Sequence, residues 1–195
     1  MSVSSVAVVG AGPKGLSIAE AIAKADLPVT VVCVTGARVE HASRRLRRTL
    51  DMRVDFGELR RADADAIAEL VRFERDLGAA ADADLVIESA VGDVRAKRAL
   101  LATIEGRMSR GAVLASNTTR AELEAMAEVL VRRDQFLGLR FFHPATHTPL
   151  VEVMPLTETA PGALVACHTL CRWLGKTPVE PAEGSWPEGH ALTES

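Results

Sequence analysis

The stretch VAVVGAGPKGLSIA, residues 6–19, decides the fold of this chain. An apolar run of strand length breaks at Gly10 into the spacing G-x-G-x-x-G, completed by Gly12 and Gly15, and a helical pattern follows. The first glycine permits a tight turn, the second lets a ligand approach the backbone without a Cβ in the way, and the third allows close packing of helix on strand. Amide groups and the positive end of the helix that starts near Pro13 then face an anion.

A second apolar run at residues 29–34 supplies the strand, turn, helix and strand context that this spacing needs before it indicates a dinucleotide site. A glycine turn without a ligand is the plain alternative, and this context argues against it. We therefore expect a Rossmann-like unit in which the pyrophosphate of a dinucleotide lies over the turn. The residues expected to contact it are Gly10, Gly12, Pro13, Lys14 and Gly15.

The composition is typical of one α/β domain: 195 residues, 48% of them hydrophobic, with a formal net charge of −3. The basic cluster at residues 44–48 fits one face of a helix, so we expect no nucleic-acid or membrane partner. No apolar run reaches the roughly 18 residues of a membrane span, and no signal-peptide pattern precedes the first strand. We expect a soluble, cytoplasmic protein.

The cysteines and histidines predict no metal site. Cys33, Cys167 and Cys171 are too few and too irregularly spaced for a disulfide framework. Because Cys167 and Cys171 lie four residues apart on an expected helix, we interpret them as small apolar groups on one buried face. The histidines are scattered, without the spacing of a zinc site.

Apolar runs of strand length recur along the chain, with helical patterns between most of them; they lie at residues 6–9, 29–34, 85–88, 112–115, 136–142 and 150–153. This alternation indicates βαβ units and a doubly wound, mostly parallel sheet. Residues 37–82 are unusually long and charged for a connection, and they predict a helical arm inserted after the second strand. Its helices are expected at 39–50 and 61–72, with a turn at 56–58.

The C-terminal part predicts the end of a single domain. A helix is expected at residues 162–174 and a short strand at 177–180. Residues 182–195 are rich in Pro, Gly, Glu and Ser and predict a flexible tail. We expect one domain over residues 1–181 and no C-terminal helical domain.

Besides the glycine motif, the chain carries ADLVIESAV at 83–91, DVRAKR at 93–98, LASNTT at 114–119, GLRFFHP at 138–144 and LVEV at 150–153. In this order and at these approximate spacings, the motifs resemble the NAD-binding domain of 3-hydroxyacyl-CoA dehydrogenases. The arm is similar too, since GEL at 57–59 precedes an acidic, Ala-rich helix like that family's helical clasp.

The resemblance implies reversible oxidation of a 3-hydroxyacyl thioester to the 3-keto compound, with hydride passing to the nicotinamide of NAD. In the family a histidine in an H-F-F-N-P segment removes the hydroxyl proton, and a glutamate in a later L-V-E-V segment orients that histidine. Glu152 matches the glutamate, Ser116 a serine that assists a substrate oxygen, and Asn117 the residue beside the nicotinamide. Glu88 and Lys97 match cofactor-side positions.

One departure from the family concerns the catalytic base. The family's histidine falls on Arg140, whose guanidinium stays protonated at neutral pH and cannot act as a base, and the family's asparagine falls on His143. In one interpretation Arg140 and Glu152 form an ion pair where an acid–base pair stood. In the other, His143 or His147 transfers the proton while Arg140 holds an anionic or thioester oxygen. Because neighbours in a strand alternate faces, the second interpretation requires a turn near Pro144.

Another departure concerns the cofactor. Rossmann domains that prefer NAD usually end their second strand with an acidic residue that binds the adenosine ribose. Counted from residue 29, this position is Cys33, and Arg38 follows as a residue that could receive a 2′-phosphate. NADP therefore becomes possible beside NAD. A buried strand position is the plain alternative for Cys33.

Three functions stay open. The first is an NAD(P)-dependent oxidoreductase of 3-hydroxyacyl thioesters, carried on CoA or a carrier protein, with a second copy or a partner subunit in place of the family's helical C-terminal domain. The second is a catalytically inactive binding or scaffold module, favoured by Arg140, Cys33 and the missing domain. The third is a non-redox enzyme that reuses His143 and Glu152. The surviving cofactor-side residues favour the first.

Overall fold

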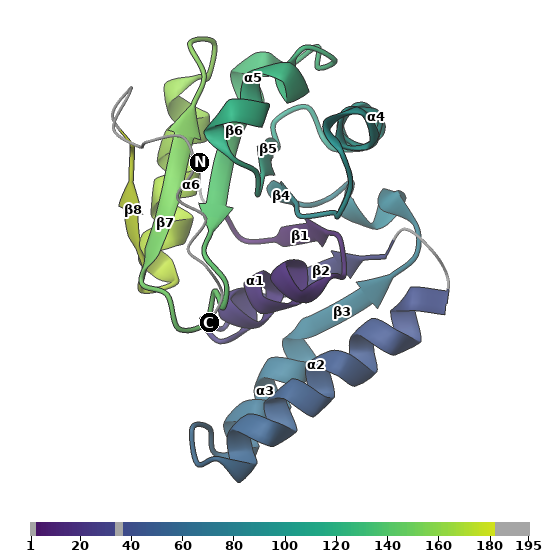
Figure 1. The fold of residues 1–195 in the computed structure, drawn as a ribbon, viewed down its shortest axis with the longest axis vertical. Coiled ribbons are helices and arrows are strands. Elements are labelled where there is room, and N and C mark those ends of the chain that lie inside the picture. The colour runs from purple at the N-terminus through teal and green to yellow at the C-terminus, as the bar shows by residue number, and fades with distance from the viewer. Residues whose placement is uncertain (1–2, 34–36, 182–195) are drawn as a thin grey trace.

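The computed structural model describes residues 3–33 and 37–181, with the side chains of all of these except residues 37 and 38. Eight strands form one sheet in the order β3-β2-β1-β4-β5-β6-β7-β8 (Figure 1). The strands are β1 (Val6–Val9), β2 (Val29–Val32), β3 (Val71–Glu74), β4 (Leu85–Glu88), β5 (Val113–Ser116), β6 (Phe136–Phe141), β7 (Leu150–Pro155) and β8 (Thr177–Val179). The expected tail at 182–195 lies outside the described residues.

Every strand pairing in this sheet is parallel except that of β6 with β7, which confirms the predicted doubly wound, mostly parallel sheet. The strand β1 lies between β2 and β4, where the strand order reverses. In open sheets of this kind ligands bind beyond the carboxyl ends of the strands at such a reversal. The topology therefore places the candidate site where β1 and β4 end.

Helices cover both faces of the sheet; they are α1 (Pro13–Ala23), α2 (Ala37–Asp55), α3 (Arg61–Leu70), α4 (Val94–Glu105), α5 (Arg120–Ala127) and α6 (Pro161–Trp173), with short 3-10 turns η1 (Leu77–Ala80) and η2 (Arg133–Gln135). Successive strand residues point to opposite faces. Val8 and Ile87 pack with α1, α2, α3 and α6, whereas Ala7 and Val86 pack with α4 and α5. Both faces are thus buried, as the near-continuous apolar strands require.

The helices α2 and α3 form the predicted arm, and Figure 1 shows them side by side at one end of the molecule, beyond β3. Arg53 ties the arm to the domain: it is 9% exposed, donates a hydrogen bond to Glu20 of α1, and donates through Nε to Glu58 at 2.9 Å. Because this cation is nearly buried between two carboxylates, the arm is fixed against α1 and does not hang free.

The arm was predicted too long, because residues 71–74 form the edge strand β3, which pairs with β2 from Val29↔Val71 onward. The sequence VRFE carries a charge at every second position, so it lacks the apolar run by which the other strands are recognised. Its alternation is that of an edge strand with one covered face. The helix expected to reach residue 72 accordingly ends at Leu70. Within the described residues, no helix is long and apolar enough to cross a membrane.

Asp84, just before β4, offers a pH-dependent test of the fold. Its Oδ2 accepts hydrogen bonds from the amide and hydroxyl of Ser4, at 2.8 and 2.7 Å, and from those of Ser5, at 3.0 and 3.1 Å. The Ser4 hydroxyl is the main cause that holds the pKa of Asp84 below its usual value. A lowered carboxyl pKa stabilises the fold above the unfolded-state value near 4, and this stability is lost as the pH falls through the lower folded-state value.

We expect Asp84→Asn to lower the free energy of unfolding at neutral pH by about 1 kcal/mol and to flatten its decline below about pH 4. Chemical denaturation across a pH series measures both effects. The matched control is Asp82→Asn, because Asp82 is exposed and no hydrogen bond to its carboxylate is found in the described residues. Equal acid dependence of wild type and Asp84→Asn would contradict this account.

Candidate functional site

The glycine turn between β1 and α1 has the shape that a diphosphate needs. Gly10 has φ +123°, and a Cβ there would lie 2.6 Å from the Ser89 carbonyl oxygen. A Cβ on Gly15 would lie 1.9 Å from the Gly10 oxygen, so the helix packs directly on the turn. Among the residues that the structure describes, a Cβ on Gly12 would meet only Val91, at 3.7 Å. The space in front of Gly12 is therefore open, and a methyl group there would fill it.

The start of α1 is suited to an anion. Gly12 is its N-cap and provides no side-chain hydrogen bond, so the first amide groups of the helix keep free donors. Pro13, at the first helical position, has no amide hydrogen to lose. The positive end of the helix dipole adds to these donors. The open cradle over Gly12 and the uncapped helix together fit the pyrophosphate of a dinucleotide.

Glu88, at the end of β4, lies inside the protein and holds the residues at the neighbouring edge of the sheet in place. Its side chain is fully buried; Oε1 accepts from the Ala90 amide at 2.7 Å and Oε2 accepts from the Ser116 hydroxyl at 2.5 Å. Lys97 Nζ lies 3.9 Å from Oε2 and balances its charge. Both of its oxygens have partners inside the protein, and contact of Glu88 with a cofactor stays a prediction.

Ser116, at the end of β5, is also turned toward the inside of the protein. It is fully buried and donates its hydroxyl hydrogen to Glu88, so it lies behind the crevice and does not present a donor to a substrate oxygen. The matching of motifs placed Ser116 at the correct strand end but could not show which way its hydroxyl points. The Lys97 side chain is 12% exposed and contacts Glu88, so Lys97 also supports this edge of the sheet from inside the protein.

Asn117 connects three strand ends at the candidate site. Its amide donates to the Glu88 carbonyl at 2.7 Å, its Nδ2 donates to Ser89 Oγ at 3.2 Å, and its Oδ1 accepts from the Phe141 amide at 2.9 Å. Ser89 in turn backs on Gly10. Asn117 thus holds β4, β5 and β6 in one frame beside the glycine turn. Sequence reasoning missed Ser89, although its place at the end of a strand next to Glu88 was a usable signal.

Arg140 and Glu152 form an ion pair. They are cross-strand partners in β6 and β7, and Arg140 Nη1 lies 3.1 Å from Glu152 Oε2. The Arg140 guanidinium also lies over the Phe142 ring, 4.9 Å from its centroid. The Glu152 side chain is 6% exposed and that of Arg140 is 37% exposed. This is the arrangement that the first of the two interpretations describes.

Comparison with known proteins decides the family. The family model described as "3-hydroxyacyl-CoA dehydrogenase, NAD binding domain" matches residues 5–183. The chain belongs to this family. The match confirms the resemblance read from the motifs, and it agrees with the dinucleotide cradle over Gly12, so NAD is the cofactor that this 3-hydroxyacyl-CoA dehydrogenase-type domain is built to bind.

Relatives in the 3-hydroxyacyl-CoA dehydrogenase family are longer than this chain. The fatty acid oxidation complex subunits alpha of Psychrobacter cryohalolentis and Pseudomonas putida are 31% and 30% identical over 91% of the chain, which spans 25% of their length. Among solved structures, FadB2 of M. tuberculosis matches with TM-score 0.88 and 32% identity, and (S)-3-hydroxybutyryl-CoA dehydrogenase PaaH1 of Ralstonia eutropha with 0.86 and 30%. Both matches cover 92% of this chain, and 64% and 63% of those chains.

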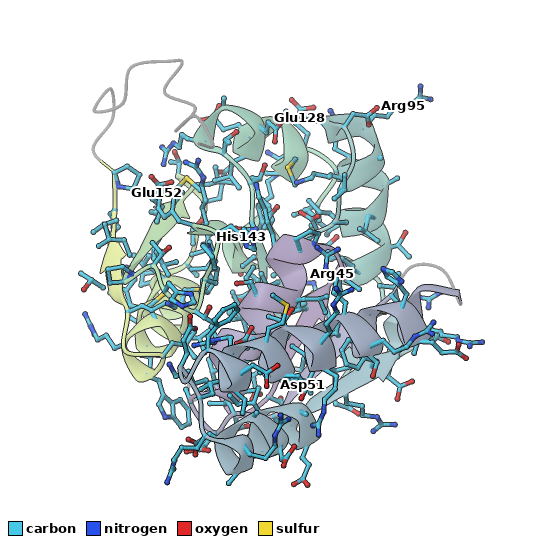
Figure 2. All side chains as sticks on the ribbon, turned by 60° about the horizontal axis from the view of Figure 1, so that its bottom comes forward. Arg45, Asp51, Arg95, Glu128, His143 and Glu152 are labelled. Carbon is cyan, nitrogen blue, oxygen red and sulfur yellow. The ribbon has the colours of Figure 1, made fainter. Side chains whose placement is uncertain are left out.

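The structure does not bring His143 and Glu152 together. His143 is exposed on the loop between β6 and β7 and lines a pocket of about 390 Å³ between α1, the arm and this loop. Figure 2 shows His143 apart from Glu152, and Arg45 of α2 contributes to the pocket as well. His147 also lines it, with Nε2 3.5 Å from Glu58 Oε2. The only contact found for the Glu152 carboxylate in the described residues is Arg140.

The loop that carries His143 is anchored from two sides. The Ala145 amide donates to Ser17 Oγ of α1 at 2.7 Å. Lys176, 8% exposed, donates from Nζ to the carbonyl oxygens of Thr148, at 2.7 Å, and Ala145. The chain does turn near Pro144, as the second interpretation requires, but the turn leads His143 toward α1 and the arm. Sequence reasoning missed this pocket, because its walls come from segments far apart in the chain.

The side chain of Cys33, directly after β2, lies in the core of this family member. It is fully buried and packs in the core with Val29 and Val31, on the same face of β2. The structure thus shows the buried strand position that was the plain alternative for Cys33, and NADP beside NAD stays a prediction. The Arg38 side chain lies outside the described residues.

The other two cysteines behave as predicted. Cys167 and Cys171 are fully buried on one face of α6, and burial raises the pKa of the Cys171 thiol to about 12. Thiols with so high a pKa are poor nucleophiles and poor metal ligands at neutral pH. Over residues 3–33 and 37–181, no group of three or more His, Cys, Asp or Glu side chains could hold a metal ion.

Proposed function

We propose that this chain is the dinucleotide-binding part of an oxidoreductase that interconverts 3-hydroxyacyl and 3-ketoacyl thioesters. The observation that carries the proposal is the open cradle over Gly12 at an uncapped helix start, next to the edge fixed by Asn117. The names of the relatives support the thioester substrate. When bound there, the nicotinamide supplies hydride transfer.

In this proposal, different residues of the chain bind the diphosphate, orient the nicotinamide and transfer the substrate proton. The amides at the start of α1 bind the diphosphate, and Asn117, held by Ser89 and the Phe141 amide, orients the edge where the nicotinamide is expected. His143, exposed at the pocket, is the residue that we propose for the substrate proton. An imidazole is the side chain best suited to proton transfer near neutral pH.

The thioester carrier and the assembly belong to the proposal as well. We propose CoA or a carrier protein as the carrier, and a second copy or a partner subunit as the cover of the pocket that lies between α1, the arm and the loop after β6. A cytoplasmic location stays a prediction.

A catalytically inactive binding module is the second candidate function. The Arg140–Glu152 ion pair favours it, because the carboxylate that would orient a catalytic base is already neutralised by a guanidinium that cannot accept a proton. The two candidates differ in turnover and not in cofactor binding.

Reduction of acetoacetyl-CoA by NADH, followed by the loss of NADH absorbance, separates them. We expect turnover by the wild-type chain and a loss of about 100-fold or more in kcat for His143→Gln, with NADH affinity unchanged. His41→Gln is the matched control, because His41 is exposed on α2 and does not line the pocket. NADH binding without any turnover would overturn the oxidoreductase and leave the binding module.

A further inference from the structure

Lys176, directly before β8, is a buried cation that the proposed chemistry does not use. It is 8% exposed, and its Nζ donates to the carbonyl oxygens of Thr148, at 2.7 Å, and Ala145. Over residues 3–33 and 37–181, no carboxylate lies within ion-pair distance of this ammonium. Burial is the main cause that lowers the pKa of Lys176 below its ordinary value. Because burying a cation without a carboxylate costs free energy, its contribution lies in the hydrogen bonds to the loop and not in filling space.

The segment that this ammonium binds is a closed turn, residues 144–148. The Pro144 carbonyl oxygen accepts from the amides of His147 and Thr148, both at 3.1 Å, and from the Thr148 hydroxyl at 3.1 Å. The ammonium joins the carbonyl oxygens of Ala145 and Thr148, which lie three residues apart in this turn. One buried group therefore fixes both the beginning and the end of the turn.

His143 directly precedes this turn and is held on its other side as well. Phe141 donates its amide hydrogen to Asn117 Oδ1 at 2.9 Å, and the Ala145 amide donates to Ser17 Oγ at 2.7 Å. A single residue separates His143 from each of these two fixed points. The position of its backbone therefore depends on the anchors of the turn.

The position of a proton-transfer group matters, because proton transfer requires hydrogen-bond distance to the reacting oxygen. A displacement of 1 Å can lower a rate by about 100-fold. The imidazole of His143 is exposed, and in the part of the chain that the structure describes no hydrogen bond holds its ring. The hydrogen bonds of the turn are therefore what keeps it at the pocket.

We propose that Lys176 is a positioning residue for His143: its buried ammonium fixes the turn at 144–148 and so keeps the imidazole at the pocket beside α1. The proposal rests on the proposed function for the role of His143 in proton transfer, and it goes beyond that function by assigning a task to Lys176. Lys176 acts through the carbonyl groups of the turn and touches neither substrate nor cofactor. Its loss lowers the rate of proton transfer and leaves dinucleotide binding as it is.

A double-mutant cycle on the reduction of acetoacetyl-CoA by NADH tests this coupling. Lys176→Met keeps an apolar stem but removes the ammonium, and we expect it to lower kcat by about tenfold or more with NADH affinity unchanged. In a His143→Gln background, the same substitution is expected to change the residual kcat by less than about twofold. Lys24→Met is the matched control, because Lys24 is an exposed lysine close enough to affect the pKa of Lys176.

The NMR signal of the Cε1–H group of His143 reports the position of its ring without turnover. Its absence from His143→Gln assigns the signal. We expect Lys176→Met to shift and broaden it, while the signal of the exposed His41 stays the same. Lys176→Gln is the second variant, in case Lys176→Met does not fold. It keeps an amide donor but is too short to reach both carbonyl oxygens, so we expect the same changes at a smaller size.

The outcomes separate this proposal from the proposed function. A loss of kcat that is confined to chains with His143, together with a changed His143 signal, supports the positioning role. Equal losses in both backgrounds mean that Lys176 acts elsewhere, and they overturn it. An unchanged His143 signal in a folded Lys176 variant overturns it as well. NADH binding without any turnover in the wild type overturns the proposed oxidoreductase, and the His143 signal then decides by itself whether Lys176 positions this residue.

Discussion

Gly12→Val is expected to weaken the affinity for NAD by about 100-fold or more without unfolding the chain. Within residues 3–33 and 37–181, a Cβ at this position meets only Val91 at 3.7 Å, so this part of the protein has room for a side chain. The space that it would fill is the space over the amides at the start of α1, where the diphosphate is expected. The branched side chain of valine would hold the phosphates away from these donors.

Isothermal calorimetry with NAD and NADH measures the loss, and thermal unfolding checks that the fold is kept. The matched control is Gly162→Val, because Gly162 at the start of α6 also has open space around its Cβ position. We expect Gly162→Val to bind NAD as the wild type does. Undiminished affinity in Gly12→Val would show that the diphosphate lies elsewhere.

Gly15→Ala is expected to lower the stability of the fold, whereas Gly12→Val is expected to lower the affinity for NAD. A Cβ on Gly15 would lie 1.9 Å from the Gly10 carbonyl oxygen, which belongs to backbone and cannot rotate away. The helix α1 would have to move off the turn, and with it Leu16 and Ile18, which pack in the core. We expect the free energy of unfolding to fall by about 3 kcal/mol, and the melting temperature by roughly 6 to 12 °C.

Differential scanning calorimetry measures this change. Gly111→Ala is the control, because nothing lies within 4 Å of the Cβ position at Gly111. A melting temperature of Gly15→Ala equal to that of the control would mean that helix and strand are not packed as described. The two glycine substitutions thus separate the binding role of Gly12 from the packing role of Gly15, within one motif.

The sequence was sufficient to predict the strand–turn–helix around Gly10 because local backbone geometry requires the three glycines. The apolar runs likewise predicted the strands whose two faces are buried. The edge strand β3, from Val71 to Glu74, was missed because apolar and charged residues alternate in it. This pattern resembles the end of a helix. Local pattern therefore failed where a strand has only one covered face.

The interior of the candidate site could not be predicted in the same way. Motif matching brought Ser116, Glu88 and Asn117 to one edge, but only the structure shows that Ser116 turns inward to Glu88 while Asn117 bridges three strands. The direction of a hydroxyl depends on partners distant in sequence. Cys33 lies in the core on the face of Val29 and Val31, which is the buried strand position that the sequence offered as its plain alternative.

The Arg140–Glu152 pair was one of two interpretations of the sequence, and the structure shows this pair across β6 and β7, while proton transfer by a histidine stays a prediction. The pair joins residues that face each other across an antiparallel ladder, where opposite charges attract at close range. His143, three residues further on, follows the turn at Pro144 to the pocket beside α1. The positive charge of Arg140, held by Glu152, therefore lies apart from the exposed imidazole of His143.

The claim on which this account depends is that a dinucleotide places its diphosphate over Gly12 at the start of α1. A crystal structure of the chain soaked with NAD tests it most directly. The account predicts electron density for the diphosphate within hydrogen-bonding distance of the amides of residues 14 and 15, with the nicotinamide toward Asn117. A dinucleotide bound elsewhere, or a cradle that stays empty at saturating NAD, would contradict the account.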